Sequence, residues 1–401
     1  MKQSGSATDV LKPMTNTADI LIIGAGVQGA SLAFHLAQRG MKALVLEKRF
    51  VAAGATGRSS GLIRMHYDVR QDTELAWLSF QYFLNWKEMV GGECGFTRTG
   101  FLQLVAPADT PLLKANVAMH QAVGVPVLLI DADDVGRLAP SFSTENIELA
   151  AYEPESGYAM PSDTAASLMN SAREKGARLM QDCTVTGMDV RGGKVTGVTT
   201  TQERFSSSIV VNAAGAWAGQ LNHMIGLDLP YDTWRHDTLF VRRPHELGFS
   251  HPAVIDSAYE MYFRPEGSLT LVGLEDANTF GETPDGDTDH ARAGFVERGI
   301  DRLCKRIPAI ENGSLHSAHG GYDGITPDEH PLLGAAGPDG FYLDCGFSGT
   351  GFKTAPAVGL CMSELILDGA SKIVDLSAYS PSRFAEGRHI RGEYTYGTAW
   401  H

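Results

Sequence analysis

The distribution of apolar residues near the start of the chain predicts a strand, a helix and a second strand. Residues 18–24 (ADILIIG) form a short continuous apolar run, which is typical of a strand buried on both faces. Small apolar residues then recur at helical spacing up to Gly40, and residues 42–47 (KALVLE) form another apolar run. Short connections between these elements indicate a β-α-β unit in a parallel sheet.

The middle and the end of the chain show further strand and helix patterns. Residues 183–200 alternate β-branched and polar side chains around Gly192 and Gly193, which predicts an antiparallel hairpin. Buried strands are expected within 208–219 and 340–346, and a helix within 357–369. Weaker patterns predict helices over 75–89 and 291–307 and a strand over 268–275.

This order of elements predicts an α/β fold of two domains, each built from separate pieces of the chain. We expect a Rossmann-like nucleotide-binding domain with a parallel sheet, and an inserted substrate-binding domain with an antiparallel or mixed sheet and helices. The expected pieces are 18–80, 150–220 and 320–387 for the first domain and 81–149 and 221–319 for the second, with a flexible leader at 1–17 and a loosely ordered tail at 388–401.

Composition and charge exclude several classes of partner. The 401 residues are 43% hydrophobic and 20% charged, as in an ordinary globular protein, and the formal net charge is −14. Such a balance argues against binding to nucleic acid or to an anionic membrane surface. Apolar stretches long enough for a spanning helix are not seen, and the polar N-terminus does not resemble a signal peptide. Five scattered cysteines favour free thiols in a reducing compartment, so we expect a cytoplasmic protein.

A glycine-rich turn follows the first predicted strand and carries the clearest chemical signal. Gly24, Gly26 and Gly29 form G-x-G-x-x-G between strand and helix, where the backbone and the helix N-terminus can approach a pyrophosphate. Glu47 ends the second strand at the place where a carboxylate accepts hydrogen bonds from a ribose diol. The turn therefore predicts a dinucleotide with a free 2′-hydroxyl, either FAD or NAD.

The segment that follows Glu47 favours FAD over NAD. Residues 48–64 (KRFVAAGATGRSSGLIR) form a long polar loop rich in small residues, whereas an NAD domain normally continues directly into its next helix. The antiparallel hairpin before a late strand also suits FAD enzymes of two domains. His316 and His319 are three residues apart but lack accompanying cysteines and carboxylates, so no metal site is predicted.

Taken together, five segments resemble the D-amino-acid oxidase / sarcosine oxidase class of FAD-dependent amine oxidoreductases, nearest its sarcosine oxidase branch with beta-subunit-like members. The resemblance covers nearly the whole chain. Its segments are IIGAGVQGASLAFHLAQRG with VLEK, GRSSGLIRMHY, VVNAAGAWAG, TPDEHPLLG and CGFSGTGFKTAPAVG.

The resemblance implies a set of residues that contact FAD. The expected contacts are Gly24, Gly26, Val27, Gln28, Gly29, Glu47, Lys48, Arg58, Ser59, Ser60, Gly61, Leu62, Val185, Ala214, Gly215, Trp217, Gly321, Gly349, Thr350, Gly351, Phe352 and Lys353. We further expect the backbone N–H groups of residues 349–351 to approach the pyrimidine edge of the ring, where reduced flavin carries negative charge.

The same resemblance implies the substrate site. Arg64 matches an arginine that binds the substrate carboxylate, and Lys353 matches a second carboxylate-binding position. Tyr262 and Arg264 resemble a site-facing Tyr-x-Arg segment, and His66, close to Arg64, is a candidate neighbour of the substrate amine.

Two departures from the resembled branch bear on cofactor attachment and on the electron acceptor. Gly321 stands where monomeric sarcosine oxidases have the cysteine that tethers the flavin, so non-covalent FAD is expected. Leu271 and Glu275 stand where that branch has an oxygen-activating lysine and a histidine of the site. The acceptor therefore stays open between O2 and an electron-carrier protein or quinone.

The implied reaction is oxidation of a small amino acid or N-alkyl amino acid, of the sarcosine, proline or D-amino-acid type, to its imine. A hydride would pass to the flavin from the α-carbon or from the N-linked carbon. One alternative is a dehydrogenase that passes electrons to a carrier, and another is a non-catalytic or sensory FAD-binding protein. A homo- or hetero-oligomer is compatible with an enzyme and with a non-catalytic FAD-binding protein.

Overall fold

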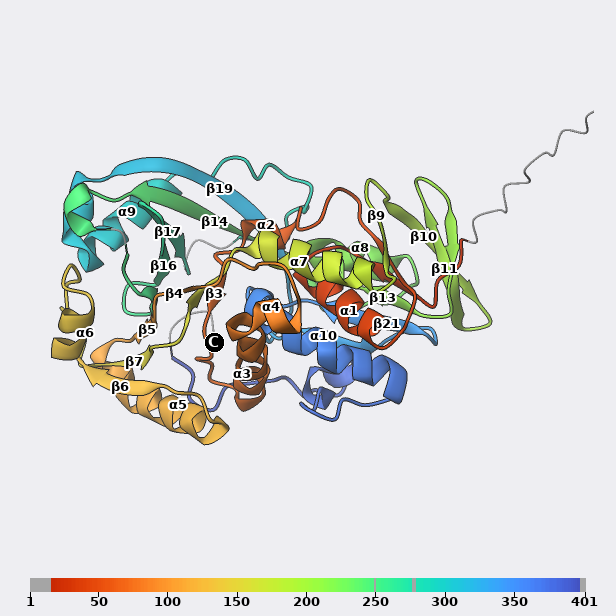
Figure 1. Ribbon diagram of the computed structural model, residues 1–401, viewed down its shortest axis with the longest axis horizontal. Helices are drawn as coiled ribbons and strands as arrows, with labels where there is room; N and C mark the ends of the chain where they lie inside the picture. Colours follow the sequence, from red (N-terminus) through yellow and green to blue (C-terminus); the bar gives the residue numbers. More distant parts are fainter. Residues whose placement is uncertain (1–15, 249, 276–278, 397–401) are drawn as a thin grey trace, which may run out of the picture.

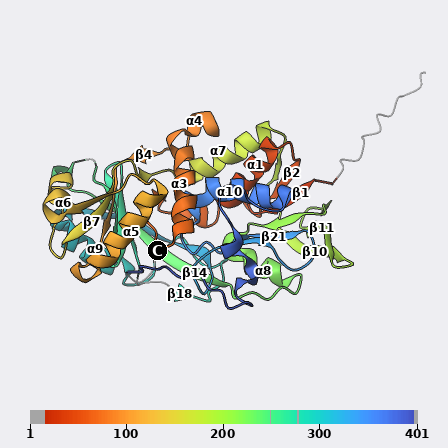
Figure 2. The ribbon, with the colours of Figure 1, turned by 90° about the horizontal axis from the view of Figure 1, so that it is seen from below.

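The computed structural model describes residues 16–248, 250–275 and 279–396 and contains two large sheets. They lie towards opposite ends of an elongated molecule, and helix α3 lies between them in both views (Figures 1 and 2). The described part of the chain contains no helix that is both long and apolar enough to span a bilayer.

The first sheet has six strands and is parallel except at one edge. Strand β20 pairs antiparallel with β21, and the other neighbours run parallel. The predicted strand-helix-strand unit is confirmed as β1, α1 and β2. In spatial order the strands are β20 (Leu332–Ala335), β21 (Phe341–Cys345), β13 (Val210–Asn212), β1 (Ile20–Ile23), β2 (Ala43–Leu46) and β9 (Arg178–Met180).

The second sheet has nine strands and is antiparallel apart from the pairing of β15 with β5. Along its main path the strands are β18 (Thr279–Phe280), β14 (Asp232–Arg242), β17 (Leu269–Leu274), β16 (Met261–Glu266), β15 (Ala253–Asp256), β5 (Phe101–Leu104), β7 (Leu149–Glu153) and β6 (Leu128–Asp131), while β19 (Ser314–Ile325) pairs with β14. Both β7 and β19 belong to this sheet and extend across the expected boundaries at 150 and 320, and the division into domains stays a prediction.

Two small sheets and the helices complete the fold. The predicted hairpin is confirmed as β10 and β11, joined at Gly192 and Gly193. The small sheets contain β10 (Val185–Arg191), β11 (Lys194–Thr200) and β12 (Arg204–Ser206), and β3 (Leu62–Ile63), β8 (Gly157–Tyr158) and β4 (Thr97–Arg98). The helices are α1 (Val27–Gln38), α2 (Ala55–Arg58), α3 (Arg70–Leu84), α4 (Trp86–Met89), α5 (Thr110–Val123), α6 (Ala132–Leu138), α7 (Pro161–Glu174), α8 (Ala218–His223), α9 (Phe295–Arg306) and α10 (Gly351–Asp368).

Helix α1 is buried along nearly its whole length, because α7 and α10 pack on it beside the six-stranded sheet. Eleven of its twelve residues are buried, and such a helix needs partners on every side. Ser31 Oγ donates to the carbonyl of Ala355 at 2.7 Å, and His35 Nε2 lies 3.0 Å from the carbonyl oxygen of Pro356. Burial lowers the pKa of His35 to about 4, so its ring is neutral in this contact.

The TPDEHPLLG segment acts as a structural junction. Arg383 donates from Nε and Nη2 to the two carboxylate oxygens of Asp328, both at 2.8 Å, and both side chains are buried. Burial alone would lower the pKa of His330, but the carboxylate of Asp72 at 2.9 Å raises it to about 9. This segment therefore joins α3 to the end of the chain.

The segment expected to be a loosely ordered tail forms hydrogen bonds to other parts of the chain within its described residues, 388–396. The N–H of Ile390 donates to Asp328, and Asn116 in α5 donates to the carbonyl of Tyr394 at 2.9 Å. The Tyr396 hydroxyl is hydrogen-bonded to His66, which therefore contacts the chain end. These bonds join residues far apart in the sequence, and the looseness of the tail stays a prediction. The expected leader lies outside the described residues except for Asn16 and Thr17.

We predict that Gly359→Ala destabilises the protein by roughly 1–3 kcal/mol, because α1 and α10 cross closely at this glycine. An added Cβ would lie 2.3 Å from Ser31 Oγ and 2.7 Å from the Ser31 carbonyl carbon. Urea unfolding measures the change. The matched control is Gly136→Ala in α6, where the new Cβ would meet only Thr144 at 3.7 Å. Equal stability of the two variants would contradict the close crossing.

Candidate active site

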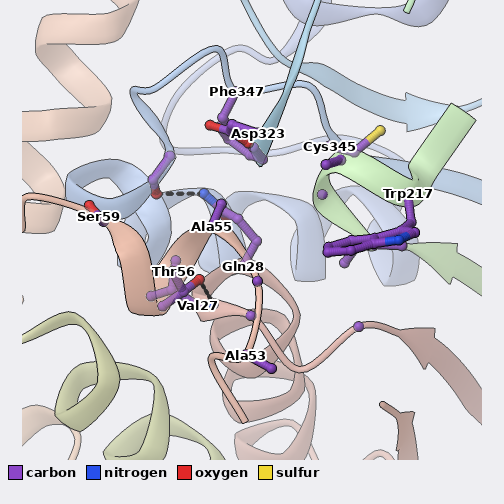
Figure 3. A pocket seen from close by; sticks show the side chains of 18 of the residues that line it. Val27, Gln28, Ala53, Ala55, Thr56, Ser59, Trp217, Asp323, Cys345 and Phe347 are labelled. Carbon is purple, nitrogen blue, oxygen red and sulfur yellow. Dashed lines mark hydrogen bonds between the residues drawn. The ribbon is translucent and has the colours of Figure 1, made fainter. Parts of the chain in front are cut away.

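A long cavity runs along the carboxyl ends of the parallel strands and reaches the nine-stranded sheet. Ile23, Leu46, Ala213 and Cys345 line it from the ends of β1, β2, β13 and β21 or from the residue that follows. Tyr262 of β16 lines the far part. Ligands of open α/β sheets bind at this edge of the strands, and Figure 3 shows part of the cavity.

The predicted glycine turn forms one wall of the cavity. Gly24 has φ +107°, and a Cβ there would lie 2.5 Å from the carbonyl oxygen of Ala213. A Cβ on Gly29 would lie 2.1 Å from the carbonyl oxygen of Gly24. Both positions therefore require glycine. Helix α1 begins at Val27, whose N–H donates to Thr56 Oγ1 at 3.0 Å, and the following amides of its first turn are available to an anion.

Glu47 lies beside this turn with its carboxylate held by backbone amides. Its oxygens accept from the N–H of Ala25 at 2.9 Å and of Arg49 at 2.8 Å. Farther out, Asp285 accepts from Lys48 Nζ at 2.7 Å and from Trp217 Nε1 at 2.9 Å. Since Lys48 and Trp217 line the cavity, the loop that follows β18 contacts its wall through Asp285.

These features fit FAD. The glycine cradle would be filled by any Cβ, and the N-termini of helices α1 and α10 lie at the same cavity. Glu47 supplies a carboxylate for a ribose, and the cavity continues beyond the turn to Arg64, Tyr262 and Lys353.

Two cationic side chains meet at the far part of the cavity. Arg64 and Lys353 both line it, with exposed fractions of 2% and 7%. The Arg64 guanidinium carbon lies 4.4 Å and Lys353 Nζ 5.7 Å from the ring centroid of Tyr67. Burial, and next the charge of Arg64, lower the pKa of Lys353 well below its ordinary value. The charged form of Lys353 is therefore disfavoured in this cavity, although the carboxylate of Asp72 opposes the shift.

Two buried acidic side chains, Glu153 and Glu275, also interact with the charge of Arg64. Burial raises the pKa of Glu153 to about 7, although hydrogen bonds from Ser156 and Met65 and the charge of Arg64 oppose the shift. Burial also raises the pKa of Glu275 well above its ordinary value, and the charge of Arg64 is the largest opposing influence. Glu275 does not line the cavity, and a role for it at the substrate end stays a prediction.

Most of the predicted site residues line this one cavity. They are Gly24, Gly26, Val27, Gln28, Glu47, Lys48, Ser59, Ser60, Leu62, Arg64, Val185, Ala214, Gly215, Trp217, Tyr262, Gly349, Gly351, Phe352 and Lys353. Gly29 lies under the turn, and Gly61 lies against the carbonyl of Ala159. Roles in FAD or substrate binding stay predictions for all of them.

Arg264 does not line the cavity, which corrects the expectation for the Tyr-x-Arg segment. Tyr262 and Arg264 are two residues apart in β16 and therefore point to the same side of the sheet. Only their different positions along the strand explain why Tyr262 lines the cavity and Arg264 does not. Arg264 donates to the carbonyl of Ser60 and, at 2.8 Å, to Glu266, and its guanidinium carbon lies 4.3 Å from the ring centroid of Tyr158. It therefore supports the loop that carries Ser60.

Arg58 and Gly321 border a smaller adjoining pocket instead of the main cavity. A Cβ on Gly321 would lie 2.9 Å from Cβ of Arg58, so the arginine stem occupies the space that a side chain would need. Leu271 packs in an apolar cluster with Leu62 and Tyr262. Non-covalent attachment of FAD stays a prediction.

The loop before α10 differs from the expectation. The N–H of Gly349 donates to Asp323 Oδ2 at 3.0 Å, and the N–H of Thr350 donates to the carbonyl of Phe347 at 2.9 Å. These two amides are therefore not directed to the cofactor, because the turn and a neighbouring carboxylate take them. Thr350 does not line the cavity, whereas Gly351, the first residue of α10, does.

Several lining residues have no counterpart in the sequence-based set, among them Asp323, His236 and Asp344. Asp323 lies two residues after Gly321 in β19, and this spacing alone would have placed the two on one face of the strand. Burial lowers the pKa of His236 to about 4 and raises the pKa of Asp344 to about 7. Among the described residues, no group of three histidine, cysteine or acidic side chains forms a metal site.

Comparison with known proteins agrees with the fold and the cofactor. Residues 19–365 match the DAO family model, described as FAD dependent oxidoreductase. Human mitochondrial sarcosine dehydrogenase is 27% identical over 95% of this chain, and human mitochondrial dimethylglycine dehydrogenase is 27% identical over 94%. The chain spans only 44% and 45% of those two proteins. The crystal structure of L-proline dehydrogenase from P. horikoshii superposes with a TM-score of 0.87 at 28% identity, covering 94% of this chain and 100% of that one.

We predict that Gly26→Ala weakens FAD binding by roughly tenfold, about 1–2 kcal/mol, while the protein stays folded. The backbone at Gly26 has φ −68°, which alanine adopts, but the added Cβ would enter the cavity wall 3.2 Å from Thr56 Oγ1. The flavin-to-protein absorbance ratio and the FAD dissociation constant measure the effect, with Gly136→Ala as control. Unchanged FAD affinity in the Gly26 variant would contradict the assignment of this turn to the cofactor.

Proposed function

Because the chain belongs to the DAO family of FAD-dependent oxidoreductases, we propose that it oxidises a small amino acid or N-alkyl amino acid to its imine. The relatives named sarcosine dehydrogenase, dimethylglycine dehydrogenase and L-proline dehydrogenase support an amine that carries a carboxylate. Sarcosine-, proline- and D-amino-acid-type substrates are the candidates.

The pairing of Arg64 with Lys353 carries this proposal. The two side chains are buried at the end of the FAD cavity, and both lie over the ring of Tyr67. Burial and the charge of Arg64 disfavour the ammonium form of Lys353, and a bound carboxylate would offset both effects. A guanidinium can take a carboxylate with two parallel hydrogen bonds, which fixes the orientation of the substrate as well as its position.

Lys353 also provides a route for the proton that the substrate amine must lose. Electrons leave the carbon beside nitrogen most readily when the amine is neutral. In the cavity as it stands, burial and Arg64 favour the neutral form of Lys353, whereas an arriving carboxylate favours its ammonium form. We therefore propose that carboxylate binding draws a proton to Lys353 Nζ as the substrate nitrogen gives one up.

The remaining work of the site is positional. FAD, when bound, accepts the two electrons and the hydrogen that leave the substrate carbon. Ile255, Tyr262 and Leu62 line the substrate end and make it largely apolar, so they exclude water from the reacting groups. Orientation by the carboxylate clamp then directs the C–H bond towards the ring.

A dehydrogenase that passes electrons to a carrier protein or quinone is favoured over an oxidase. Leu271, at the position of the oxygen-activating lysine in the resembled branch, is packed in an apolar cluster. The relatives named above are dehydrogenases. The cytoplasmic location, the oligomer and the division into domains stay predictions, and a non-catalytic FAD-binding protein is the remaining alternative.

The proposal is tested by following the visible spectrum of the FAD-loaded protein anaerobically with sarcosine, proline, glycine and D- and L-amino acids. We expect at least one carboxylate-bearing amine to bleach the flavin absorbance. Bleaching by none of them would favour the non-catalytic alternative. Admitting air then separates the acceptors, because slow return of the absorbance supports a dehydrogenase and rapid return an oxidase.

We predict that Lys353→Met raises the dissociation constant of the productive amine roughly ten- to a hundredfold, the equivalent of one charge-assisted hydrogen bond. FAD should stay bound, because the glycine turn and Glu47 are unchanged. Anaerobic flavin titration measures both quantities. Lys372→Met is the control, since that side chain is 73% exposed and remote. Unaltered amine affinity would refute the role of Lys353.

A further inference from the structure

An acidic side chain faces the cavity beside the N-terminus of α10, and it is not among the residues expected to contact FAD or the substrate. Asp323, in β19, lines the cavity next to Phe347 (Figure 3). Its carboxylate oxygens accept from the N–H of Gly324 at 2.8 Å and of Gly349 at 3.0 Å. Two backbone amides therefore fix its orientation without using all of its acceptor capacity.

The surroundings of Asp323 do not neutralise it. Within the described ranges, no lysine, arginine or histidine forms an ion pair with this carboxylate, and burial raises its pKa. The nearby acidic groups are the thiol of Cys345 and the phenol of Tyr231, whose pKa values are both raised by burial. A carboxylate that faces a cofactor cavity under these conditions favours a ligand that offers a hydrogen-bond donor.

The oxidised ring system of FAD offers a single N–H group, the imide N3–H, which lies between two carbonyl groups. The wall near Asp323 has the complementary pattern. Asp323 is an acceptor, and beside it the first turn of α10 begins at Gly351, where N–H groups are free of helical partners. Gly349 cannot serve as one of those donors, since its N–H is bonded to Asp323.

We propose that Asp323 accepts a hydrogen bond from the imide N3–H of FAD and so fixes the pyrimidine edge of the ring against the N-terminus of α10. The inference rests on the FAD that the family binds and is independent of the amine substrate. The negative charge of Asp323 also opposes the charge that the ring gains on reduction, so it lowers the midpoint potential of the bound flavin.

Two variants separate the hydrogen bond from the charge. Asp323→Asn keeps an oxygen acceptor and removes the charge, whereas Asp323→Ala removes both. Asp163→Asn, an exposed acid in the first turn of α7, is the matched control. Each purified protein is stripped of flavin and titrated with FAD and with 3-methyl-FAD, which lacks the N3–H, and the midpoint potential of the FAD complex is then measured. No substrate is needed, so failure of the proposed amine oxidation would not affect the result.

We expect the wild-type protein to bind FAD roughly ten- to a hundredfold more tightly than 3-methyl-FAD, as for a hydrogen bond to a charged group. Asp323→Asn should keep most of this preference and raise the midpoint potential, and Asp323→Ala should lose the preference. Asp163→Asn should match the wild type in both measurements.

Three results would overturn the proposal. One is a preference for FAD over 3-methyl-FAD that persists in Asp323→Ala. Another is an unchanged midpoint potential in Asp323→Asn. The third is a folded Asp323→Asn protein that binds neither flavin, because this variant retains the acceptor.

Discussion

The close crossing of α1 and α10 is the constraint on which the site depends. Gly359 allows α10 to approach the backbone of α1 at Ser31, and Gln28, Ser31 and His35 lie on the face of α1 that meets α10. Each of these three side chains bonds to a carbonyl of α10, the first of them to Gly351 at 2.7 Å. The crossing therefore brings two helix N-termini to one cavity, one at the glycine turn and one beside Lys353.

Electrostatics then divides the cavity into two functional parts. Near the glycine turn, helix N-termini and backbone amides favour the phosphates of FAD, and Glu47 is kept in place by amides of its own. At the far part, Arg64 and Lys353 both lie over the ring of Tyr67, and burial and the charge of Arg64 disfavour the ammonium form of Lys353. A bound anion would favour the charged form of Lys353, which is the clearest physical reason to expect a substrate carboxylate at that place.

Local sequence patterns predicted the parts of the fold that depend on neighbouring residues. The first strand, α1 and the second strand follow from apolar runs and a glycine turn, and the hairpin follows from alternation around two glycines. Arg64, Lys353 and Glu47 came from motifs, and all three line the cavity. Side chains set by distant partners were not predictable in this way.

Three features of the structure could not be predicted from local sequence patterns, because each depends on a partner that is distant in the sequence. Arg264 is bound to the carbonyl of Ser60, about two hundred residues away in the chain, and does not line the cavity. The amide of Gly349 is taken by Asp323 of another strand, which no local pattern indicates. The chain end contacts α5 and His66 through single hydrogen bonds whose partners are distant in sequence.

The central claim is that a carboxylate binds beside the flavin in this cavity, and its most direct test uses unreactive ligands. The absorption spectrum of the FAD-loaded protein is recorded during titration with propionate and, separately, with propionamide, which has nearly the same shape without the charge. If Arg64 and Lys353 bind a carboxylate, we expect a saturable change of the flavin spectrum with propionate and little or none with propionamide. Equal responses to the two, or no response to propionate, would contradict it.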